Sequence, residues 1–85
     1  MASAKVLLLN DNRTRMEFVV LVLEEVFGKT RDEAIRLVLN IDHDGSGVCG
    51  VYEPAQAWNI AERVTQLARQ NYFPLRCLVE PDLTI

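Results

Sequence analysis

The residues best suited to chemistry in this sequence lie at one polar turn. Asn10 and Asp11 directly follow an apolar run, and their side-chain oxygens are hydrogen-bond acceptors at a place where the backbone must turn. Thr14 and Glu17 have the Thr-x-x-Glu spacing of a capping box, in which each side chain bonds the other residue's backbone N–H. This box would start a helix whose first apolar residue is Met16. The pattern therefore predicts half of a site for a small cation that carries an apolar group.

The other half of this site is predicted at the end of a second helix. Thr30 and Glu33 have the spacing of another capping box, and apolar residues at helical spacing carry the helix to about Asn40. Because the connection between the two helices is short, they would pack as an antiparallel pair, with the start of the first beside the end of the second. A pocket with an apolar interior and acceptors at its rim would form there. Its residues would be Asn10, Asp11, Met16, Val19, Val38, Ile41 and Asp42.

The order of the apolar patterns predicts a single two-layer α+β domain, with a three-stranded antiparallel sheet backed by three helices. Its central strand, or one buried on both faces, would be a short continuous apolar run. Gly28 would end the first helix as a left-handed cap, and Pro81 would stop the last strand. The domain would span residues 5–81, between tails at 1–4 and 82–85. The predicted elements are a strand at Lys5–Leu9, helices at Met16–Phe27 and Arg31–Asn40, a strand at Val48–Tyr52, a helix at Pro54–Gln70 and a strand at Leu75–Glu80.

Composition and charge exclude several classes of partner. The chain has 85 residues, a formal charge of −3 and no basic run, so nucleic acid and anionic membranes are poor partners while a cationic ligand is a better one. No apolar stretch reaches the ~20 residues that a membrane helix needs. Cys49 and Cys77 lie far apart in the sequence, which favours reduced thiols in the core of a cytoplasmic protein. We expect a monomer.

The polar segment Asp42–Gly47 permits two other interpretations, a calcium loop and a catalytic site. In a calcium loop beginning at Asn40, positions 1, 3, 5 and 6 of the EF-hand pattern would be Asn40, Asp42, Asp44 and Gly45. However, Val51 stands where that loop requires a bidentate glutamate. His43 is the only histidine, and no nucleophile lies at a recognisable spacing from it. We therefore expect a solvated polar loop without a metal, a cofactor or catalytic activity.

Three separate motifs carry a resemblance to a known family. They are Leu9–Val19, which resembles an "NDxxT-MEFV" segment, Gly45–Tyr52, which resembles "G-x-CGV(F/Y)", and Leu67–Cys77, which resembles an "AR-N…PL-C" ending. Together they resemble the ClpS family, the adaptors of the bacterial N-end rule pathway, from Lys5 to Glu80. The resemblance implies a small α/β domain that binds N-degron substrates beginning with Leu, Phe, Tyr or Trp. It would deliver them to a ClpA-type (or ClpC-type) AAA+ unfoldase, which feeds the ClpP protease, and it would catalyse nothing itself.

The resemblance also implies roles for particular residues. Asn10 and Asp11 match family residues that bond the substrate's α-amino group and first peptide unit. Thr14 and Met16 match residues at the border of the pocket, where Met16 would exclude β-branched side chains. The positions that match the lining of the hydrophobic pocket are Val19, Val22, Ile41 and Leu75.

The chain departs from the family at the end of the second predicted helix, on the side of the pocket opposite the polar turn. Asp42 stands where the family generally has a histidine that receives the α-ammonium group. A carboxylate is still an acceptor there and adds charge attraction, although His43 turning inward is an alternative. Val38 stands where methionine is common, so it should enlarge or reshape the pocket, and Asn12 replaces a second aspartate.

The third helix departs further from the family. Family members carry charged residues near its start that help contact the N-terminal domain of the unfoldase. Here those positions fall around Ala55, Trp58 and Ile60, which are apolar or small. Trp58 either packs into the domain or belongs to an apolar docking face, since exposed tryptophan is a frequent hot spot. The alternative function is a non-catalytic interaction domain that docks through this helix and has a vestigial or altered peptide pocket.

Overall fold

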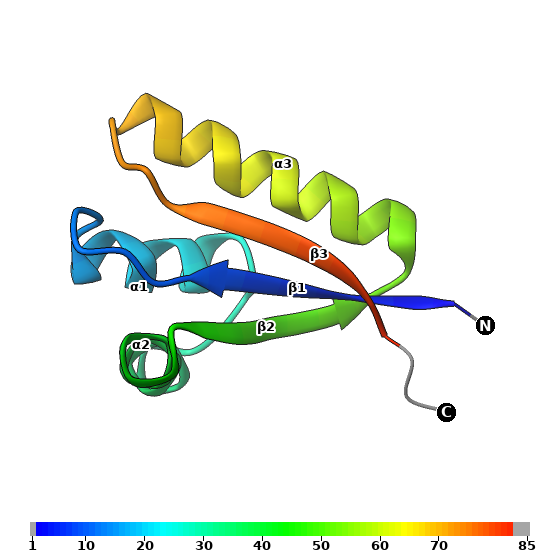
Figure 1. The fold of residues 1–85 in the computed structure, drawn as a ribbon, viewed down its shortest axis with the longest axis horizontal. Coiled ribbons are helices and arrows are strands. Elements are labelled where there is room, and N and C mark those ends of the chain that lie inside the picture. Colours follow the sequence, from blue (N-terminus) through cyan, green and yellow to red (C-terminus); the bar gives the residue numbers. More distant parts are fainter. Residues whose placement is uncertain (1, 83–85) are drawn as a thin grey trace.

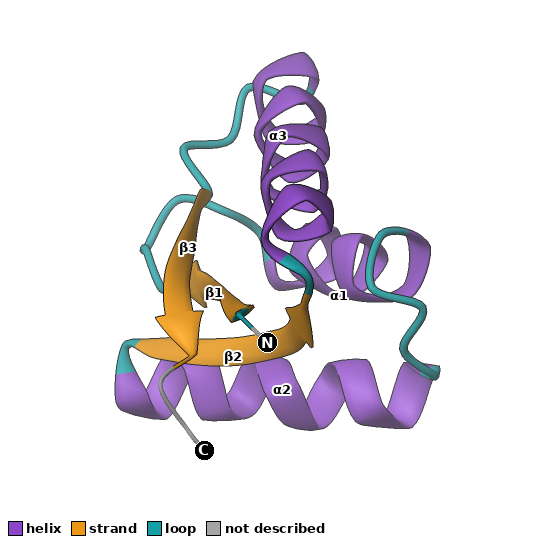
Figure 2. Cartoon of the chain, turned by 90° about the vertical axis from the view of Figure 1, so that its right-hand side faces the viewer, coloured by secondary structure: helices purple, strands orange, loops and turns teal. Residues whose placement is uncertain are grey.

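The described part of the chain, residues 2–82 of a computed structural model, contains three strands and three helices. They are β1 (Ser3–Leu9), α1 (Met16–Glu25), α2 (Arg31–Asp44), β2 (Ser46–Tyr52), α3 (Pro54–Gln70) and β3 (Arg76–Asp82) (Figure 1). The strands form an antiparallel sheet in the order β2-β1-β3. Figure 2 shows α1 and α3 on the same side of the sheet, while α2 runs along β2. The predicted α+β domain is confirmed.

The central strand β1 connects the sheet to the helices. Its side chains alternate between buried and half-buried positions, because successive residues of a strand point to opposite faces. Val6 and Leu8 have no exposed surface, whereas Leu7 and Leu9 between and beyond them are only half-buried. The apolar run is therefore a central strand that buries one face completely, and it is not buried on both faces.

The two predicted capping boxes have different outcomes. At the start of α2, the Glu33 N–H donates to Thr30 Oγ1 at 3.2 Å and the Thr30 N–H donates to Glu33 Oε1 at 2.8 Å, so this box is confirmed. The box predicted at Thr14 and Glu17 is wrong. Helix α1 begins one residue later than that spacing requires, so its N-cap is Arg15, which makes no side-chain capping bond.

The end of α2 extends further than its sequence indicates. The helix reaches Asp44, where Gly45 ends it in a left-handed conformation (φ 89°) and donates its N–H to the Ile41 carbonyl at 2.8 Å. The predicted loop at Asp42–Gly47 is therefore wrong, because its first half is helical and its last two residues begin β2. Polar residues can form this last turn since they lie on exposed faces of the helix. An EF-hand loop cannot form from a segment that is helical here.

Other predicted boundaries also move. Helix α1 ends at Glu25, and Gly28 adopts the predicted left-handed conformation (φ 67°) in the connection beyond it. Strand β1 starts at Ser3, inside the predicted N-terminal tail, and β3 continues through Pro81 to Asp82. Pro81 does not stop β3, because an edge strand tolerates a residue without an N–H. The remaining tail positions, 1 and 83–85, lie outside the described residues.

Small side chains let α3 pack closely on the sheet. Its buried residues are Ala57, Ala61, Val64 and Ala68.

Cys49 and Cys77 are free thiols on the two strands that flank β1. Two strand spacings separate them by about 10 Å, beyond the ~7 Å limit for a disulfide. Burial raises the pKa of Cys49 to about 11 and that of Cys77 to about 12, so both stay protonated at neutral pH.

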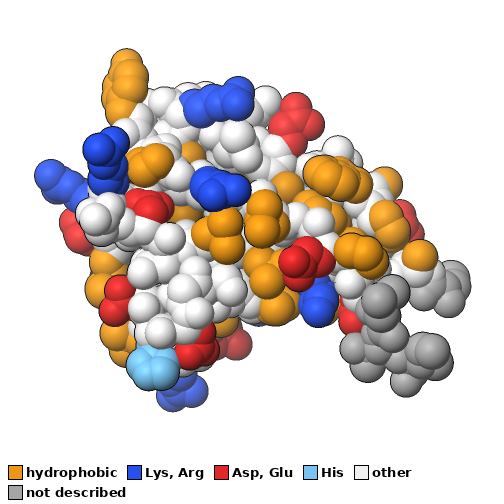
Figure 3. All heavy atoms as spheres, viewed as in Figure 1, with side chains coloured by type: hydrophobic (Ala, Val, Ile, Leu, Met, Phe, Trp, Pro, Cys, Tyr) orange, Lys and Arg blue, Asp and Glu red, His pale blue; other side chains and the backbone are white. Residues whose placement is uncertain are grey.

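Several large apolar side chains remain exposed. Trp58 at the start of α3 is 63% exposed, and Tyr72 in the turn after α3 is 94% exposed. Figure 3 shows hydrophobic side chains gathered over β3 and the beginning of α3. Within the described residues, no helix is long and apolar enough to cross a membrane.

The capping box of α2 yields a stability prediction. We expect Thr30→Ala to lower the free energy of unfolding by about 1 kcal/mol, because the Glu33 N–H loses its side-chain acceptor. Thr30→Ser keeps a hydroxyl acceptor and should stay within about 0.5 kcal/mol of the parent chain. Urea denaturation measures both variants. An equal loss for serine and alanine would contradict the capping role.

Candidate functional site

A small pocket opens where the end of β1, the following turn, the start of α1 and the end of α2 meet. Its volume is about 100 Å³. An engineered cavity of roughly 150 Å³ in another protein holds one benzene molecule, so this pocket is of the size of one side chain. The residues that line it are Leu8, Leu9, Asn10, Asp11, Thr14, Met16, Val19, Val38, Ile41, Asp42 and Leu75.

The interior of the pocket is apolar and well packed. Val19, Val38, Ile41 and Leu75 are each at most 8% exposed, so their positions are held by the surrounding core. Ile41 lies against Gly47 of β2, where an added Cβ would approach Ile41 Cγ1 to 2.8 Å. A glycine at position 47 is thus needed to leave Ile41 in place. A group that enters this interior must be apolar, because a charged group would lose its hydration without compensation.

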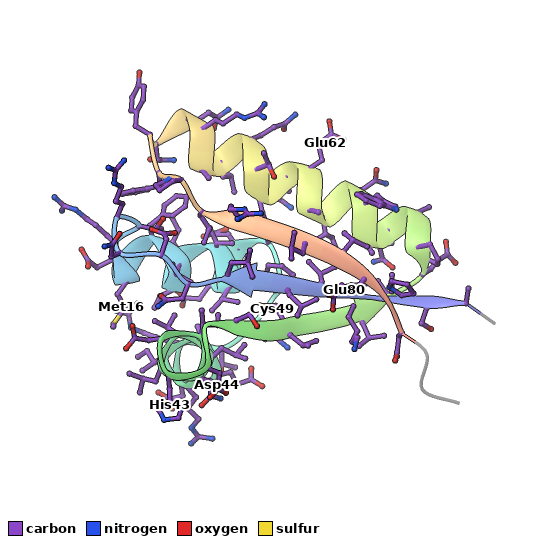
Figure 4. All side chains as sticks on the ribbon, in the orientation of Figure 1. Met16, His43, Asp44, Cys49, Glu62 and Glu80 are labelled. Atoms are coloured by element: carbon purple, nitrogen blue, oxygen red, sulfur yellow. The ribbon has the colours of Figure 1, made fainter. Side chains whose placement is uncertain are left out.

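Met16 is the most exposed of the apolar residues that line the pocket. It begins α1 and is 50% exposed. Figure 4 shows its side chain directed from the start of α1 toward the side of the molecule where α2 lies. A flexible thioether at this border can shape the entrance.

Acceptor groups lie at the rim. The side chains of Asn10 and Asp42 are exposed, and within residues 2–82 neither makes a hydrogen bond or an ion pair. The Asn10 backbone N–H donates to the Gly45 carbonyl at 2.8 Å, which ties the turn to the end of α2. Side-chain acceptors from two separate segments are thereby held around one opening, where they can receive a small cation.

Asp11 has a different role from the other rim acceptors. Its Oδ1 accepts the Arg13 N–H at 2.8 Å and the Thr14 N–H at 2.6 Å, and its Oδ2 accepts the Thr14 hydroxyl at 2.8 Å. Partial burial alone would raise the pKa of Asp11, but these hydrogen bonds, together with the charge of Arg13, outweigh it and lower the pKa. Asp11 therefore stabilises the turn and keeps a negative charge at the rim. Thr14 donates to this carboxylate instead of capping α1.

His43 lies outside the pocket. Its side chain is 88% exposed, and its Nδ1 lies 2.7 Å from Asp44 Oδ1. The hydrogen bond and the charge of Asp44 raise the pKa of His43. Figure 4 shows both side chains together at the end of α2. Asp42, and not His43, is the residue of this last turn that lines the pocket.

The structure brings together all but one of the residues named from the sequence for this site. Val22 is the exception: it has no exposed surface and belongs to the core, because it lies a turn further along α1 than Val19. Leu8 and Leu9 also line the pocket but were not expected there. Their position in the sequence, directly before Asn10, was the feature from which their place in the pocket could have been predicted. Ala55, Trp58 and Ile60 are on α3, away from this pocket, and Ile60 packs partly into the core beside β1.

No cluster of three or more histidine, cysteine, aspartate or glutamate residues that could hold a metal ion occurs in the part of the chain described here. The fold and the pocket define a small α+β domain with a pocket that is apolar inside and has acceptors at its rim.

Comparisons with known proteins agree with this class. The family profile described as "ATP-dependent Clp protease adaptor protein ClpS" matches residues 2–78, and the chain belongs to this family. The ClpS of Gluconobacter oxydans (strain 621H) is 51% identical over 78 residues, which cover 92% of this chain and 66% of that protein. The ClpS of Phenylobacterium zucineum (strain HLK1) is 47% identical over 81 residues, covering 95% of this chain and 74% of the relative. Both are named ATP-dependent Clp protease adapter proteins.

A solved structure is similar over nearly its whole length. The structure of Agrobacterium tumefaciens ClpS2 bound to L-phenylalaninamide has a TM-score of 0.92 and 37% sequence identity to this chain. The match covers 95% of this chain and 98% of that one. The chain is therefore an adaptor-family domain, and not a member of a protease family.

The hydrogen bonds that Asp11 accepts lead to a prediction for the pKa of its carboxyl group. We expect a carbon-13 NMR titration to give a pKa below the ordinary 3.8, and Thr14→Val to raise this pKa because it removes one donor. Since the folded-state pKa is lowered, the stability that the carboxylate contributes is present above pH 3.8 and is lost as the pH falls through the folded-state value.

The matched control is Thr65→Val, which removes a hydroxyl that donates to the Ala61 carbonyl at 2.9 Å within α3. It should leave the Asp11 titration unchanged. An Asp11 pKa that is equally low with and without the Thr14 hydroxyl would refute this account of the turn.

Proposed function

We propose that the chain is an adaptor that recognises the first residue and the free α-amino group of substrate proteins. Substrates beginning with Leu, Phe, Tyr or Trp would be delivered to a ClpA-type (or ClpC-type) AAA+ unfoldase for degradation by ClpP. The observation that carries this proposal is the pocket itself, in which an apolar interior is rimmed by the side chains of Asn10 and Asp42, which make no hydrogen bond or ion pair within residues 2–82. Membership of the ClpS family supports it. A relative bound to L-phenylalaninamide, an aromatic residue with a free amino group, supports it further.

The α-ammonium group would bind at Asp42 and Asn10. A carboxylate at position 42 provides both a hydrogen-bond acceptor and an opposite charge, which a neutral histidine would not. Asp11 adds negative charge nearby, although its oxygens already accept bonds within the turn. The resulting field favours a free amino group over an acetylated one. An acetylated or internal residue cannot supply the cation, so the contacts between the ammonium and the rim would be lost.

The first side chain would enter between Met16, Val38 and Leu75. The pocket volume of about 100 Å³ suits one side chain. A β-branched residue would carry its bulk at the rim, beside Met16, so it would be disfavoured. The short side chain of Val38 leaves more room on the α2 side than a longer one would, which favours aromatic first residues.

Peptide binding tests this proposal. We expect a fluorescent peptide that begins with Phe to bind, and its N-acetylated form to bind at least about tenfold more weakly, because a charged hydrogen bond is lost. Asp42→Ala should weaken the free peptide by about tenfold and leave the acetylated peptide unaffected. Fluorescence anisotropy measures each affinity.

Asp44→Ala is the matched control for Asp42→Ala. Both carboxylates are exposed in the last turn of α2, but Asp44 contacts His43 and does not line the pocket. This variant should bind the free peptide like the parent chain. Equal binding of free and acetylated peptides, or no binding of either, would refute the adaptor proposal and favour an interaction domain with a vestigial pocket.

The start of α3 is the proposed docking surface for the unfoldase. Trp58 is 63% exposed, and a shallow depression beside it is lined by residues from the start of β1, the start of α3 and the end of β3: Ala2, Ser3, Ala4, Pro54, Trp58, Val79 and Pro81. Ala55 is exposed on the same helix, whereas Ile60 is half-buried. An exposed tryptophan next to an apolar depression is a typical anchor of a protein interface.

A variant at Trp58 separates docking from peptide binding. We expect Trp58→Ala to weaken binding to the N-terminal domain of the unfoldase by at least about tenfold, as for an interface hot spot, with unchanged peptide affinity. Isothermal titration calorimetry measures the first and anisotropy the second. Tyr72→Ala is the control, because Tyr72 is even more exposed but lies at the opposite end of α3. If both variants bind the domain like the parent chain, docking occurs elsewhere.

The proposed setting is the cytoplasm, with the adaptor acting as a monomer. The free thiols of Cys49 and Cys77 suit a reducing compartment. Their burial keeps them in the unreactive protonated form.

A further inference from the structure

A second, larger groove lies between α1 and α2 next to the pocket. Its volume is about 380 Å³, and its surface is mostly apolar. Leu21 is 47% and Ile35 is 39% exposed along it, while Val20 beneath them is buried. The residues that line it are Met16, Glu17, Val20, Leu21, Glu24, Arg31 and Ile35.

The groove has two defined ends. At one end, Arg31 Nη1 lies 3.8 Å from Glu24 Oε1, which links the end of α1 to the start of α2. At the other end lies Met16, which lines both the groove and the pocket. The groove and the pocket are therefore neighbours that share the side chain of Met16.

The length of the groove matches a short peptide segment. From Met16 to Glu24 the helix rises by about 12 Å, at ~1.5 Å per residue. An extended peptide covers this distance in about four residues, at ~3.3 Å each. A substrate whose first side chain fills the pocket would therefore place its second to fifth residues along the groove, if its chain continues past Met16.

We propose that this groove is a secondary substrate subsite, which binds an apolar side chain from the second to fifth residues of the N-terminal segment. The inference rests on the proposed function, because it requires the first residue to occupy the pocket. Apolar surface at Leu21 and Ile35 provides the contact, and the closed end at Glu24 and Arg31 limits its length. Selection would then depend on a short sequence and not on the first residue alone.

The test uses two kinds of ligand. L-phenylalaninamide fills only the pocket, whereas peptides of the form Phe-Ser-Ser-Ser-Ser also reach the groove. A leucine is moved through positions two to five of the peptide. We expect one position to bind about fivefold more tightly than the all-serine peptide, which corresponds to partial burial of one leucine.

Substitutions in the groove test whether the tighter binding of the leucine peptide arises there. Leu21→Ser and Ile35→Ser should each reduce the advantage of the leucine peptide to less than about twofold and leave L-phenylalaninamide binding unchanged. Leu39→Ser is the matched control, because Leu39 is 54% exposed on α2 but does not line the groove. It should keep the full advantage. Since all these residues are partly exposed, their replacement leaves the core intact.

The possible outcomes separate the two proposals. If L-phenylalaninamide binds but every peptide has the same affinity, the groove is not a subsite and the adaptor proposal stands. A leucine advantage that survives both Leu21→Ser and Ile35→Ser would also overturn the groove assignment. If neither L-phenylalaninamide nor any peptide binds, the proposed function fails, and the subsite fails with it.

Discussion

The hydrogen bond from the Asn10 N–H to the Gly45 carbonyl is the contact on which the pocket depends. It continues the pairing of β1 with β2 by one residue, beyond Leu9 and Ser46, and so joins the turn after β1 to the end of α2. Gly45 makes this possible because its left-handed conformation ends the helix and turns the chain directly into β2. Without this junction, the acceptors of the turn and the carboxylate of Asp42 would belong to segments with no fixed distance between them.

The acceptors around the opening divide between structure and recognition. Asp11 uses both carboxylate oxygens to hold the turn, through two backbone N–H groups and the Thr14 hydroxyl. Asn10 and Asp42 make no such bonds within residues 2–82, so their side chains are available to a ligand. This division lowers the cost of binding, because a turn whose polar groups are already hydrogen-bonded does not need to reorganise when a cation binds. The apolar interior is held by the core in the same way, since Ile41 is positioned by its contact with Gly47.

Where the sequence-based expectations failed, a neighbouring contact had outweighed a local pattern. Thr14 and Glu17 have the same spacing as Thr30 and Glu33, yet only the second pair forms a capping box. The Thr14 N–H, which the Glu17 carboxylate would accept in a capping box, donates instead to Asp11 Oδ1 at 2.6 Å, and α1 begins one residue later. The polar run after Ile41 was expected to form a loop, but an exposed helical turn accommodates polar side chains, and the left-handed glycine that ends it comes later, at Gly45. Neither competition can be resolved from spacing alone.

The sequence by itself determined the class of fold, the order of its elements, the family and nearly all of the pocket residues. It could do so because apolar periodicity, glycine and proline positions and short motifs are local properties of the chain. Only the tertiary structure decided that Val22 belongs to the core, that Leu8 and Leu9 reach the pocket, and that Asp42 lines it while His43 faces solvent. These outcomes depend on how far α2 extends and on the rotation of each helix against the sheet. Both are set by packing between segments distant in sequence, which no local pattern records.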